Sequence, residues 1–470
     1  MGNIRRSKGH KAWLGGFIAL LALALTACLP EGTRVPESPM LASLERKSGL
    51  IVYVGVDGNI YTINQAGGKQ SALTVDGGVI DEATGERVVY DLPVWSPDAS
   101  RVAFARLMVA DQSLEEAKVL ITDPNGENRT EVLTTSEQIP IYLYWSPDGQ
   151  QLTFISTSDR SASNLVLQIV PRDGSPVEVL DAGQPYYWAW SPDSDNLLVH
   201  AGGDTSASAR LSFLNLQDGV LENRLDLLPW SFNAPAWSPQ GNQLMMAIKP
   251  EPNASRGVLA LTGLDGQVEQ ELGEFENSVA FAWAPDGKRI AYIGGRPELP
   301  NNTIGPLTVL DPNEPDKAFT TPEDENVMAF FWSRDGKRLA YFEPVLIMPS
   351  ALQAAEGTPS AGDAAPPQPT ESAPGTDEQP ILFLRLRVMN ARTGDSRNVA
   401  SFQPTDDFYR MLLNFDQYQH SATLWSPDGE NLVVSGLGQD GTPSIWVLAA
   451  SGNLTPRYIA DGQVGFWSFK

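Results

Sequence analysis

The chain has 470 residues, of which 42% are hydrophobic, and it carries a net charge of −24 at pH 7. This length is sufficient for a folded domain with a sizeable core. The excess of carboxylates argues against nucleic-acid binding, because an acidic surface repels phosphate backbones. The only cysteine is Cys28, so no disulfide bond can form within the chain.

The first 27 residues have the organisation of a secretory signal. Four basic residues precede an apolar run over 13–25, which is followed by Leu25-Thr26-Ala27-Cys28. An apolar core of about a dozen residues is shorter than the roughly 20 that span a membrane. The ending resembles the lipobox of bacterial lipoproteins, which implies transfer of a diacylglyceryl group to the Cys28 thiol and cleavage just before it. The alternative is an ordinary cleaved signal with a cysteine near the cut.

Loss of residues 1–27 removes four basic and no acidic residues. The mature chain then has 29 Lys and Arg against 57 Asp and Glu, a net charge of −28. Residues 28–48 are rich in Pro, Glu and Ser, and we predict that they form a flexible tether. The expected location is outside the cytoplasm, anchored to the bacterial cell membrane through lipid on Cys28.

The rest of the chain is organised by a repeated phrase, Trp-Ser-Pro-Asp-Gly. Its internal copies begin at Trp95, Trp145, Trp190, Trp237, Trp283, Trp332 and Trp425, and a truncated copy begins at Trp467. Consecutive copies are 50, 45, 47, 46, 49, 93 and 42 residues apart. A period in the forties indicates a repeat architecture.

Each repeat predicts four short antiparallel strands. Apolar residues lead into the Trp, as at 142–144, and Ser-Pro-Asp-Gly then makes a tight turn, in which Pro presets φ and Gly takes a positive φ. A second apolar strand follows, as at 289–292, then a third, and a short fourth such as 131–134. Four strands in about 45 residues are typical of a propeller blade.

The repeat resembles the TolB-like, WD-repeat-related β-propeller family over nearly all of residues 50–470. The resemblance implies that the Trp-bearing strand is the innermost strand of each blade. Five positions depart from the repeated phrase, namely Gln240, Arg334, Ala284, Ala99 and Ser194.

The two ends of the repeat region complement each other. Residues 50–54 look like a second strand without a first, and residues 464–468 look like a first strand with nothing after it. We therefore predict an all-β fold over residues 49–470, a single eight-bladed propeller with seven blades as the alternative. Pairing of the N- and C-terminal strands would close the ring and remove two exposed sheet edges.

One segment interrupts the unit of Trp332. Residues 349–380 consist almost wholly of Pro, Ala, Gly, Ser, Thr, Glu, Asp and Gln, a composition that cannot bury a core. We predict a disordered surface loop between the second and third strands of this unit.

Motifs for catalysis or metal binding are missing from the sequence. His200 and His420 are the histidines left after cleavage, and their spacing does not pair them as ligands. H-E-x-x-H, C-x-x-C and G-x-S-x-G do not occur. We predict no catalytic residue, no metal and no cofactor. Acidic stretches at 123–126 and 193–196 are either Ca²⁺ contacts or ordinary blade turns.

An amide residue stands shortly before most of the Trp strands. These residues are Gln138, Gln184, Asn233, Asn277, Asn326, Gln419 and Gln463, and the first unit has Asp91 instead. If the Trp strands are innermost, the amides surround one mouth of the central channel and mark a partner-binding rim. The other interpretation is that they satisfy buried backbone groups where strands begin.

Aromatic residues also allow two interpretations. In the strip 186–188, alternation places one side in the core and the other toward solvent or the channel. The eight repeated Trp residues are expected to pack between blades rather than to stack on sugars.

The functional prediction is a lipid-anchored, non-enzymatic module for protein binding or scaffolding in the cell envelope. The resemblance implies envelope proteins or their peptide segments as partners, and we expect a monomer. One alternative is a glycan-active hydrolase or lyase at the channel mouth, which needs convergent carboxylates. The other alternative is a ligand-sensing or solute-binding component of an envelope complex.

Overall fold

The computed structural model describes residues 49–470 except 82, 92, 112, 158–163, 175, 205–207, 218–220, 300–302 and 350–378. All of these residues belong to one compact unit. The predicted signal, Cys28 and the tether lie outside the described residues, as does almost all of the predicted loop 349–380. No helix in the described part of the chain is long and apolar enough to span a membrane.

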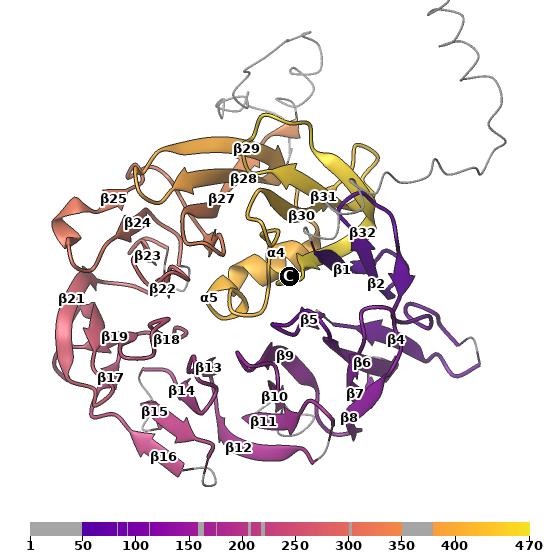
Figure 1. Cartoon of the computed structure of the whole chain (residues 1–470), viewed down its shortest axis with the longest axis horizontal. Coiled ribbons are helices and arrows are strands. Elements are labelled where there is room, and N and C mark those ends of the chain that lie inside the picture. The colour runs from indigo at the N-terminus through magenta and orange to yellow at the C-terminus, as the bar shows by residue number, and fades with distance from the viewer. Residues whose placement is uncertain are drawn as a thin grey trace, which may run out of the picture. The chain divides into compact units, whose positions relative to one another are not determined.

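Antiparallel sheets surround a centre in the arrangement of a β-propeller (Figure 1). Three of them contain β4 (Arg87–Tyr90), β5 (Val94–Trp95), β6 (Val102–Ala110), β7 (Ser113–Thr122) and β8 (Thr130–Thr135); β9 (Pro140–Trp145), β10 (Gln151–Thr157), β11 (Leu165–Pro171) and β12 (Glu178–Gly183); and β13 (Tyr186–Trp190), β14 (Asn196–Ala201), β15 (Arg210–Asn215) and β16 (Leu221–Arg224).

The next three contain β17 (Leu228–Pro229), β18 (Ala236–Trp237), β19 (Leu244–Lys249), β20 (Gly257–Thr262) and β21 (Val268–Phe275); β22 (Val279–Trp283), β23 (Ile290–Gly294), β24 (Leu307–Leu310) and β25 (Phe319–Thr320), with the 3₁₀ helix η1 (Pro315–Lys317) between the last two; and β26 (Ala329–Trp332), β27 (Arg338–Ile347), β28 (Ile381–Asn390) and β29 (Ser396–Phe402). The last sheet has six strands, β1 (Leu50–Gly55), β2 (Ile60–Asn64), β3 (Ser71–Ala72), β30 (Asn431–Leu437), β31 (Pro443–Ala449) and β32 (Arg457–Trp467).

The ring closes through its terminal strands, as predicted. The second half of β32 pairs with β1, with Phe466 opposite Val52 and Trp467 opposite Ile51. The first half of β32 pairs with β31. Since one continuous strand serves both repeats, the units of Trp425 and Trp467 share the six-stranded sheet. The described chain therefore has seven sheets, the alternative number, and they carry the eight Trp units.

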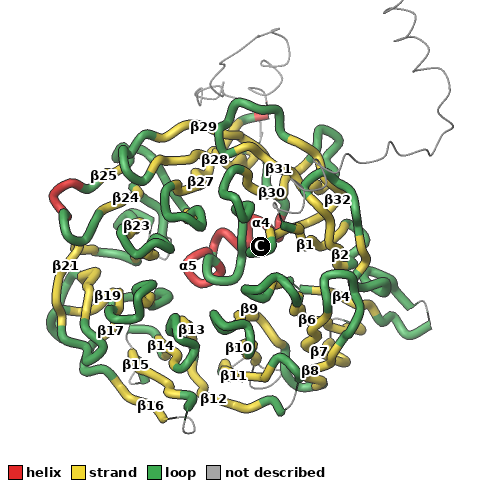
Figure 2. Tube along the Cα trace, in the orientation of Figure 1, coloured by secondary structure: helices red, strands yellow, loops and turns green. Residues whose placement is uncertain are grey.

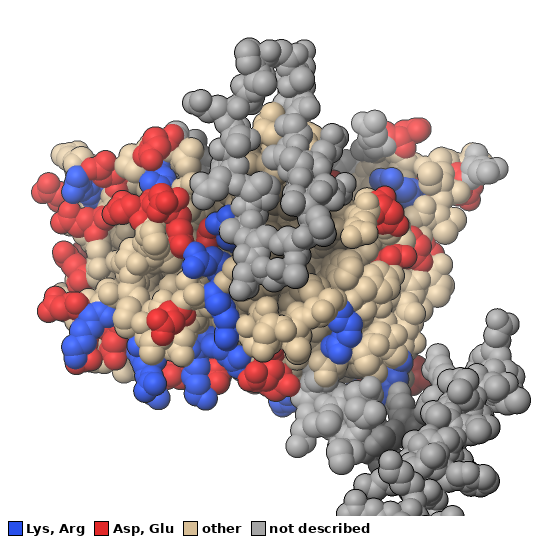
Figure 3. All heavy atoms as spheres, turned by 90° about the horizontal axis from the view of Figure 1, so that it is seen from above, with Lys and Arg blue, Asp and Glu red and all other residues tan. Residues whose placement is uncertain are grey.

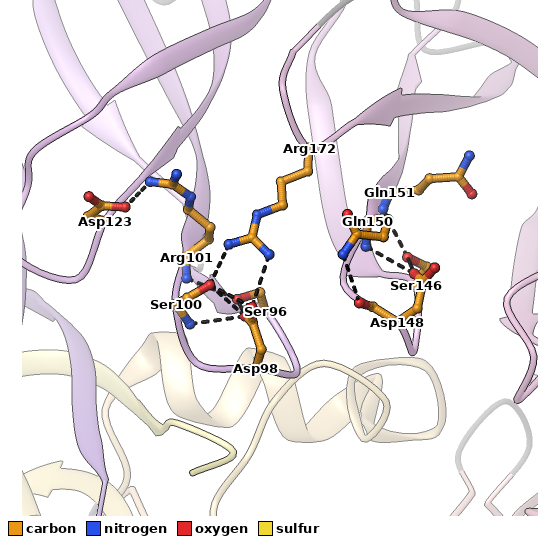
Figure 4. Close-up of polar contacts among 10 residues, drawn as sticks. All are labelled: Ser96, Asp98, Ser100, Arg101, Asp123, Ser146, Asp148, Gln150, Gln151 and Arg172. Atoms are coloured by element: carbon orange, nitrogen blue, oxygen red, sulfur yellow. Dashed lines mark hydrogen bonds and ion pairs between the residues drawn. The ribbon is translucent and has the colours of Figure 1, made fainter.

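The repeated phrase builds the same turn from sheet to sheet. Ser96 Oγ donates to Asp98 (2.6 Å) and accepts the N–H of Arg101 (2.9 Å), and Ser146 repeats both bonds in the next sheet (Figure 4). The fifth residue has a left-handed φ in all seven internal copies, including 59° at Ala99. Arg172 from the neighbouring sheet reaches Asp98 at 3.0 Å. The turns thus hold their own hairpins and also bind adjacent sheets to each other.

The acidic stretch 193–196 is one of these turns. Ser191 Oγ donates to Asp193 (2.5 Å), which also accepts the N–H of Asp195 (3.1 Å). These bonds occupy the carboxylate in the same way as in the other copies, which favours the turn interpretation over a Ca²⁺ contact.

The repeated Trp residues pack between sheets. The indole N–H groups of Trp95, Trp237 and Trp425 donate to backbone carbonyls of the preceding unit. The acceptors are Phe466 (3.2 Å), Ala189 (3.3 Å) and Phe331 (2.9 Å), respectively. Each of these bonds joins consecutive innermost strands, as expected for inter-blade packing.

The innermost strands run in a common direction, which gives the ring two faces. We call the face that carries the Ser-Pro-Asp-Gly turns the turn face, and the face where connections enter the innermost strands the amide face. The described chain begins at the turn face, where the N–H of Leu50 donates to Ser468 Oγ (2.9 Å).

Two helices occupy the centre of the ring, which the prediction of strands alone did not include (Figure 2). They are α4 (Asp406–Leu413) and α5 (Phe415–Tyr418). Thr405 caps α4 by accepting the N–H of Phe408 (3.4 Å), and α4 buries Phe408, Met411 and Leu412 on one side. We call residues 403–421, which connect β29 to the strand of Trp425, the plug.

Candidate functional site

The plug closes the central channel by contacts with the innermost strands. The Tyr142 hydroxyl on β9 donates to the Gln417 carbonyl (2.8 Å), and the Gln417 amide donates to the Trp188 carbonyl on β13 (3.3 Å). Phe415 packs against Phe330 on β26, with ring centroids 5.1 Å apart. These contacts bury the middle of the plug and fix it across the channel.

The C-terminal end of the plug is fixed in a similar way. The Gln419 amide donates to the Phe281 carbonyl on β22 (3.3 Å), and the His420 ring stacks on Tyr144 at 5.5 Å. Burial lowers the pKa of His420 to about 4, so this ring is neutral at physiological pH. His420 therefore acts here as a flat packing group.

A cavity of about 320 Å³ borders the plug on the turn face. Its wall includes the aromatic residues Trp237, Trp283, Trp332, Trp425 and Phe469. The Trp rings in this wall also pack between blades, so the cavity follows from the way in which the repeat builds the ring.

A larger cavity, of about 500 Å³, lies on the amide face, and we call it the amide-face cavity. Strands and connections of four consecutive sheets line it, together with the plug. The lining residues are Tyr187, Asp204, Trp230, Ser231, Phe232, Glu276, Asn277, Ser278, Ala280, Thr303, Ile304, Met328, Leu413, Asn414, Phe415 and Asp416. This is the volume range of small-molecule and side-chain binding pockets.

Aromatic rings held by their neighbours form one wall of the amide-face cavity. Tyr187 stacks on Phe232 with centroids 4.3 Å apart, and Phe232 also contacts the buried His200 ring at 5.0 Å. The indole N–H of Trp230 donates to the Asn277 carbonyl (2.9 Å), which fixes the plane of that ring. The wall is therefore preformed.

His200 supports this wall from behind. Its ring nitrogens lie 2.9 Å from the Asn233 carbonyl and 3.0 Å from the Gly203 carbonyl, so it connects two loops of the amide face. Burial lowers the pKa of His200, which keeps the ring neutral at physiological pH. A neutral imidazole donates only one of these two bonds.

Three carboxylates line the amide-face cavity, and two of them have cationic partners. Lys249 Nζ lies 3.8 Å from the Asp204 carboxylate and 2.8 Å from the Asp204 carbonyl oxygen. Arg256 forms an ion pair with Glu276. Asp416 has no ion-pair partner among the described residues, and it accepts the N–H of Ala234 at 3.3 Å.

Asp416 is held in a largely buried position by its neighbours in the plug. Phe415 and Gln417 on either side are buried, which fixes the position of the carboxylate between them. Burial raises the pKa of Asp416 to about 6, and the bond from Ala234 only partly offsets this effect. Asp416 is thus ionised at neutral pH at a cost in stability.

The predicted rim amides do not all line one cavity. Asn277 lines the amide-face cavity, where its amide donates to the Arg296 carbonyl (2.9 Å), and the buried Asn233 donates to the Trp230 carbonyl (3.0 Å). Gln419 lies within the channel and borders the turn-face cavity instead. The remaining four lie outside both cavities, with Gln138 and Gln463 half-buried and Gln184 and Asn326 exposed. The bonds that Asn277, Asn233 and Gln419 donate to backbone carbonyls are those expected of amides that satisfy backbone groups.

The strip 186–188 divides as alternation predicts. Tyr186 and Trp188 are buried in the core, whereas Tyr187 is half-buried and faces the amide-face cavity.

Two features of the site were missed by the sequence analysis. The plug carries a helical signal, because Thr405 is a good cap and Phe408, Met411, Leu412 and Phe415 follow the spacing of one helix face. Asp416 carries no separate signal, since its environment depends on where the plug lies. In the described part of the chain, no three His, Cys, Asp or Glu side chains are grouped closely enough to hold a metal ion.

Comparisons with known proteins agree with the fold. No protein-family model and no curated protein matches the chain. Dihydro-heme d1 dehydrogenase NirN in complex with DHE aligns with a TM-score of 0.51 at 14% identity, over 93% of this chain and 77% of that chain. Two further neighbours are an oligogalacturonate lyase from Vibrio parahaemolyticus (TM-score 0.47, 12% identity, 86% and 98% covered) and a TolB candidate from Agrobacterium tumefaciens (0.35, 13%, 76% and 90%). At these identities the likeness shows the β-propeller fold alone.

Proposed function

We propose that this protein is a lipid-anchored, non-enzymatic binding protein of the bacterial cell envelope, and that it engages its partner at the amide face. The observation that carries the proposal is the plug. It fills the channel with the chain's own side chains and leaves a preformed aromatic and acidic cavity at the amide face. Such a cavity is suited to receive a protruding group of a partner.

The carboxylates of the amide-face cavity support a binding role over glycan hydrolysis. Glycoside hydrolysis needs two carboxyl groups on opposite sides of the scissile bond. Asp204 and Glu276 are engaged by Lys249 and Arg256, which leaves Asp416 without an ion-pair partner among the described residues.

The location rests on the N-terminal sequence. A basic flank, a short apolar run and the ending Leu25-Thr26-Ala27-Cys28 are the features of a lipoprotein signal. Lipid on Cys28 would keep the ring at the membrane surface, where envelope proteins or their peptide segments are the available partners. Incorporation of radiolabelled fatty acid should be lost in Cys28→Ser, and retained label would exclude this anchor.

Site-specific photocrosslinking in the native envelope tests the binding face. A crosslinking amino acid at the exposed positions Gln184 or Asn326 reports on the amide face, and one at the exposed Gln150 reports on the turn face. We expect a discrete partner to be captured from the first two positions and not from the third. Capture of the same proteins from all three positions, or of none from the amide face, would refute the proposal.

A further inference from the structure

We infer that the amide-face cavity is a site for an organic cation, an ammonium or guanidinium group on an apolar stem, with Asp416 as its counter-ion. The inference rests on the proposed function in that it uses the same face, and it adds the chemical class of the ligand. The group can belong to a free amine or to a Lys or Arg side chain of a partner.

The carboxylate of Asp416 has unused hydrogen-bonding capacity. A carboxylate has about four lone-pair positions and here accepts a long hydrogen bond of 3.3 Å from Ala234. It lines the cavity and remains partly accessible from it. A buried carboxylate is normally paired, so its preference is for a cation that enters the cavity.

The basic side chains near the cavity are already engaged. Lys249 holds the Asp204 carbonyl at 2.8 Å, and Arg256 binds both Glu276 and Glu274. None of the residues that line the cavity is Lys, Arg or His. The missing positive charge must therefore come from outside this set of residues.

The aromatic wall of the cavity suits a cation on an apolar stem. A cation within about 6 Å of an aromatic face is attracted by the ring, and an alkyl stem packs on the same surface. Tyr187, Trp230 and Phe232 line the cavity together with Asp416. Because the Tyr187–Phe232 stack and the Trp230–Asn277 bond hold these rings in place, a ligand would lose little affinity to ordering them.

Charged side chains are distributed unevenly over the ring. Figure 3 shows that, on the side in view, Lys and Arg gather mainly along one edge and Asp and Glu along the opposite edge. The connections that enter the innermost strands supply acidic residues, such as Glu276, which lines the cavity, and Glu323. An acidic edge around the cavity increases the local concentration of cations.

Ligand-observed NMR titration of the full chain in detergent tests the inference. The probes are n-butylammonium and n-butylguanidinium, with n-butanol as the neutral control. A second arm compares the acetylated and amidated peptide Gly-Lys-Gly with the same peptide in which norleucine replaces Lys. We expect each cationic probe to bind at least tenfold more tightly than its neutral counterpart. Tighter binding of the Lys peptide than of butylammonium would identify a partner side chain as the source, and the reverse would identify a free amine.

Variants connect this binding to the cavity. Asp416→Asn should weaken binding of the cations at least tenfold, and Tyr187→Leu should weaken it several-fold. Asp324→Asn is the matched control, because this exposed carboxylate lies outside the cavity and its loss changes the net charge equally. Equal binding of charged and neutral probes, or unchanged binding in Asp416→Asn, would refute the inference.

The two proposals fail in different ways. If a partner crosslinks at Gln184 and its binding is unchanged in Asp416→Asn, the proposed binding face is supported and the cation site is refuted. If n-butylammonium binds in a way that depends on Asp416 and no partner is crosslinked, the cation site is supported and the scaffolding function is refuted.

Discussion

The hydroxyl group of Tyr142 donates a 2.8 Å hydrogen bond to the backbone carbonyl of Gln417, a residue 275 positions further along the chain. Both groups are buried, and the bond joins an innermost strand to the plug. Tyr142→Phe would leave the carbonyl of Gln417 without this donor. We expect a loss of about 1 to 2 kcal/mol in the free energy of unfolding, measured by urea denaturation.

Tyr144→Phe is the control for this prediction. Tyr144 stacks on His420, and no hydrogen bond of its hydroxyl is seen among the described residues. Its loss should change stability by less than about 0.5 kcal/mol. If both variants behave alike, the Tyr142 bond does not hold the plug.

The raised pKa of Asp416, about 6, predicts a particular dependence of stability on pH. A carboxyl group whose pKa is higher in the folded state favours folding when it is protonated. Its contribution to the free energy of unfolding is therefore lost as the pH rises from about 4 to about 6. Asp416→Asn removes that loss. The variant should be more stable than the parent by about 1 kcal/mol at pH 7.5. This is less than the full pKa shift of Asp416 would give, because the carboxylate keeps an accessible edge that solvent screens.

The gain in Asp416→Asn should shrink toward zero by pH 4. Urea denaturation of both proteins at pH 4, 5, 6 and 7.5 measures this, with Asp324→Asn as the control that keeps the overall charge equal. A gain that is independent of pH would contradict the assignment of the shift to Asp416.

The turn at Ala99 predicts a stabilising substitution. Ala99 has φ of 59°, a left-handed conformation that costs a residue with a Cβ about 1 to 2 kcal/mol. Ala99→Gly should raise the free energy of unfolding by about 0.5 to 1 kcal/mol after the greater freedom of glycine in the unfolded chain is taken into account. Thermal unfolding gives the direction, and the reverse change Gly149→Ala in the next turn should be destabilising by a similar amount.

Gly462 lies where β32 passes from one unit of the six-stranded sheet to the next. A Cβ at this position would lie 2.8 Å from the Val54 carbonyl oxygen and 2.9 Å from the Tyr53 ring. Gly462→Ala should therefore weaken ring closure by about 1 to 3 kcal/mol. Gly68→Ala is the control, because its nearest neighbour would be an ordinary 3.5 Å away and its φ is not left-handed. Equal denaturation midpoints would show that closure tolerates the extra atom.

The sequence predicted the ring but not what fills it. The phase of the repeat was enough to place Phe466 beside Val52, because a unit without a first strand needs one from elsewhere. The turn residues likewise carry local chemistry that is independent of the rest of the chain. These parts of the fold depend on short-range patterns that recur.

The plug could not be placed in the same way. Its helix-forming residues are readable, but they occur once, within a step of 93 residues that also contains the insertion. Whether Asp416 faces bulk solvent or the amide-face cavity depends on the width of the channel and on Phe330, Trp188 and Tyr142, which come from three other repeats. The rim amides show the same limit, since their common place before the Trp strands predicted a single rim, whereas Asn277 lines the amide-face cavity and Gln419 borders the turn-face cavity.

The bond from Leu50 to Ser468 places the start of the described chain on the turn face. The amide-face cavity therefore opens on the side of the ring opposite to the one at which the described chain begins, so a ligand can reach it without passing the first described residues.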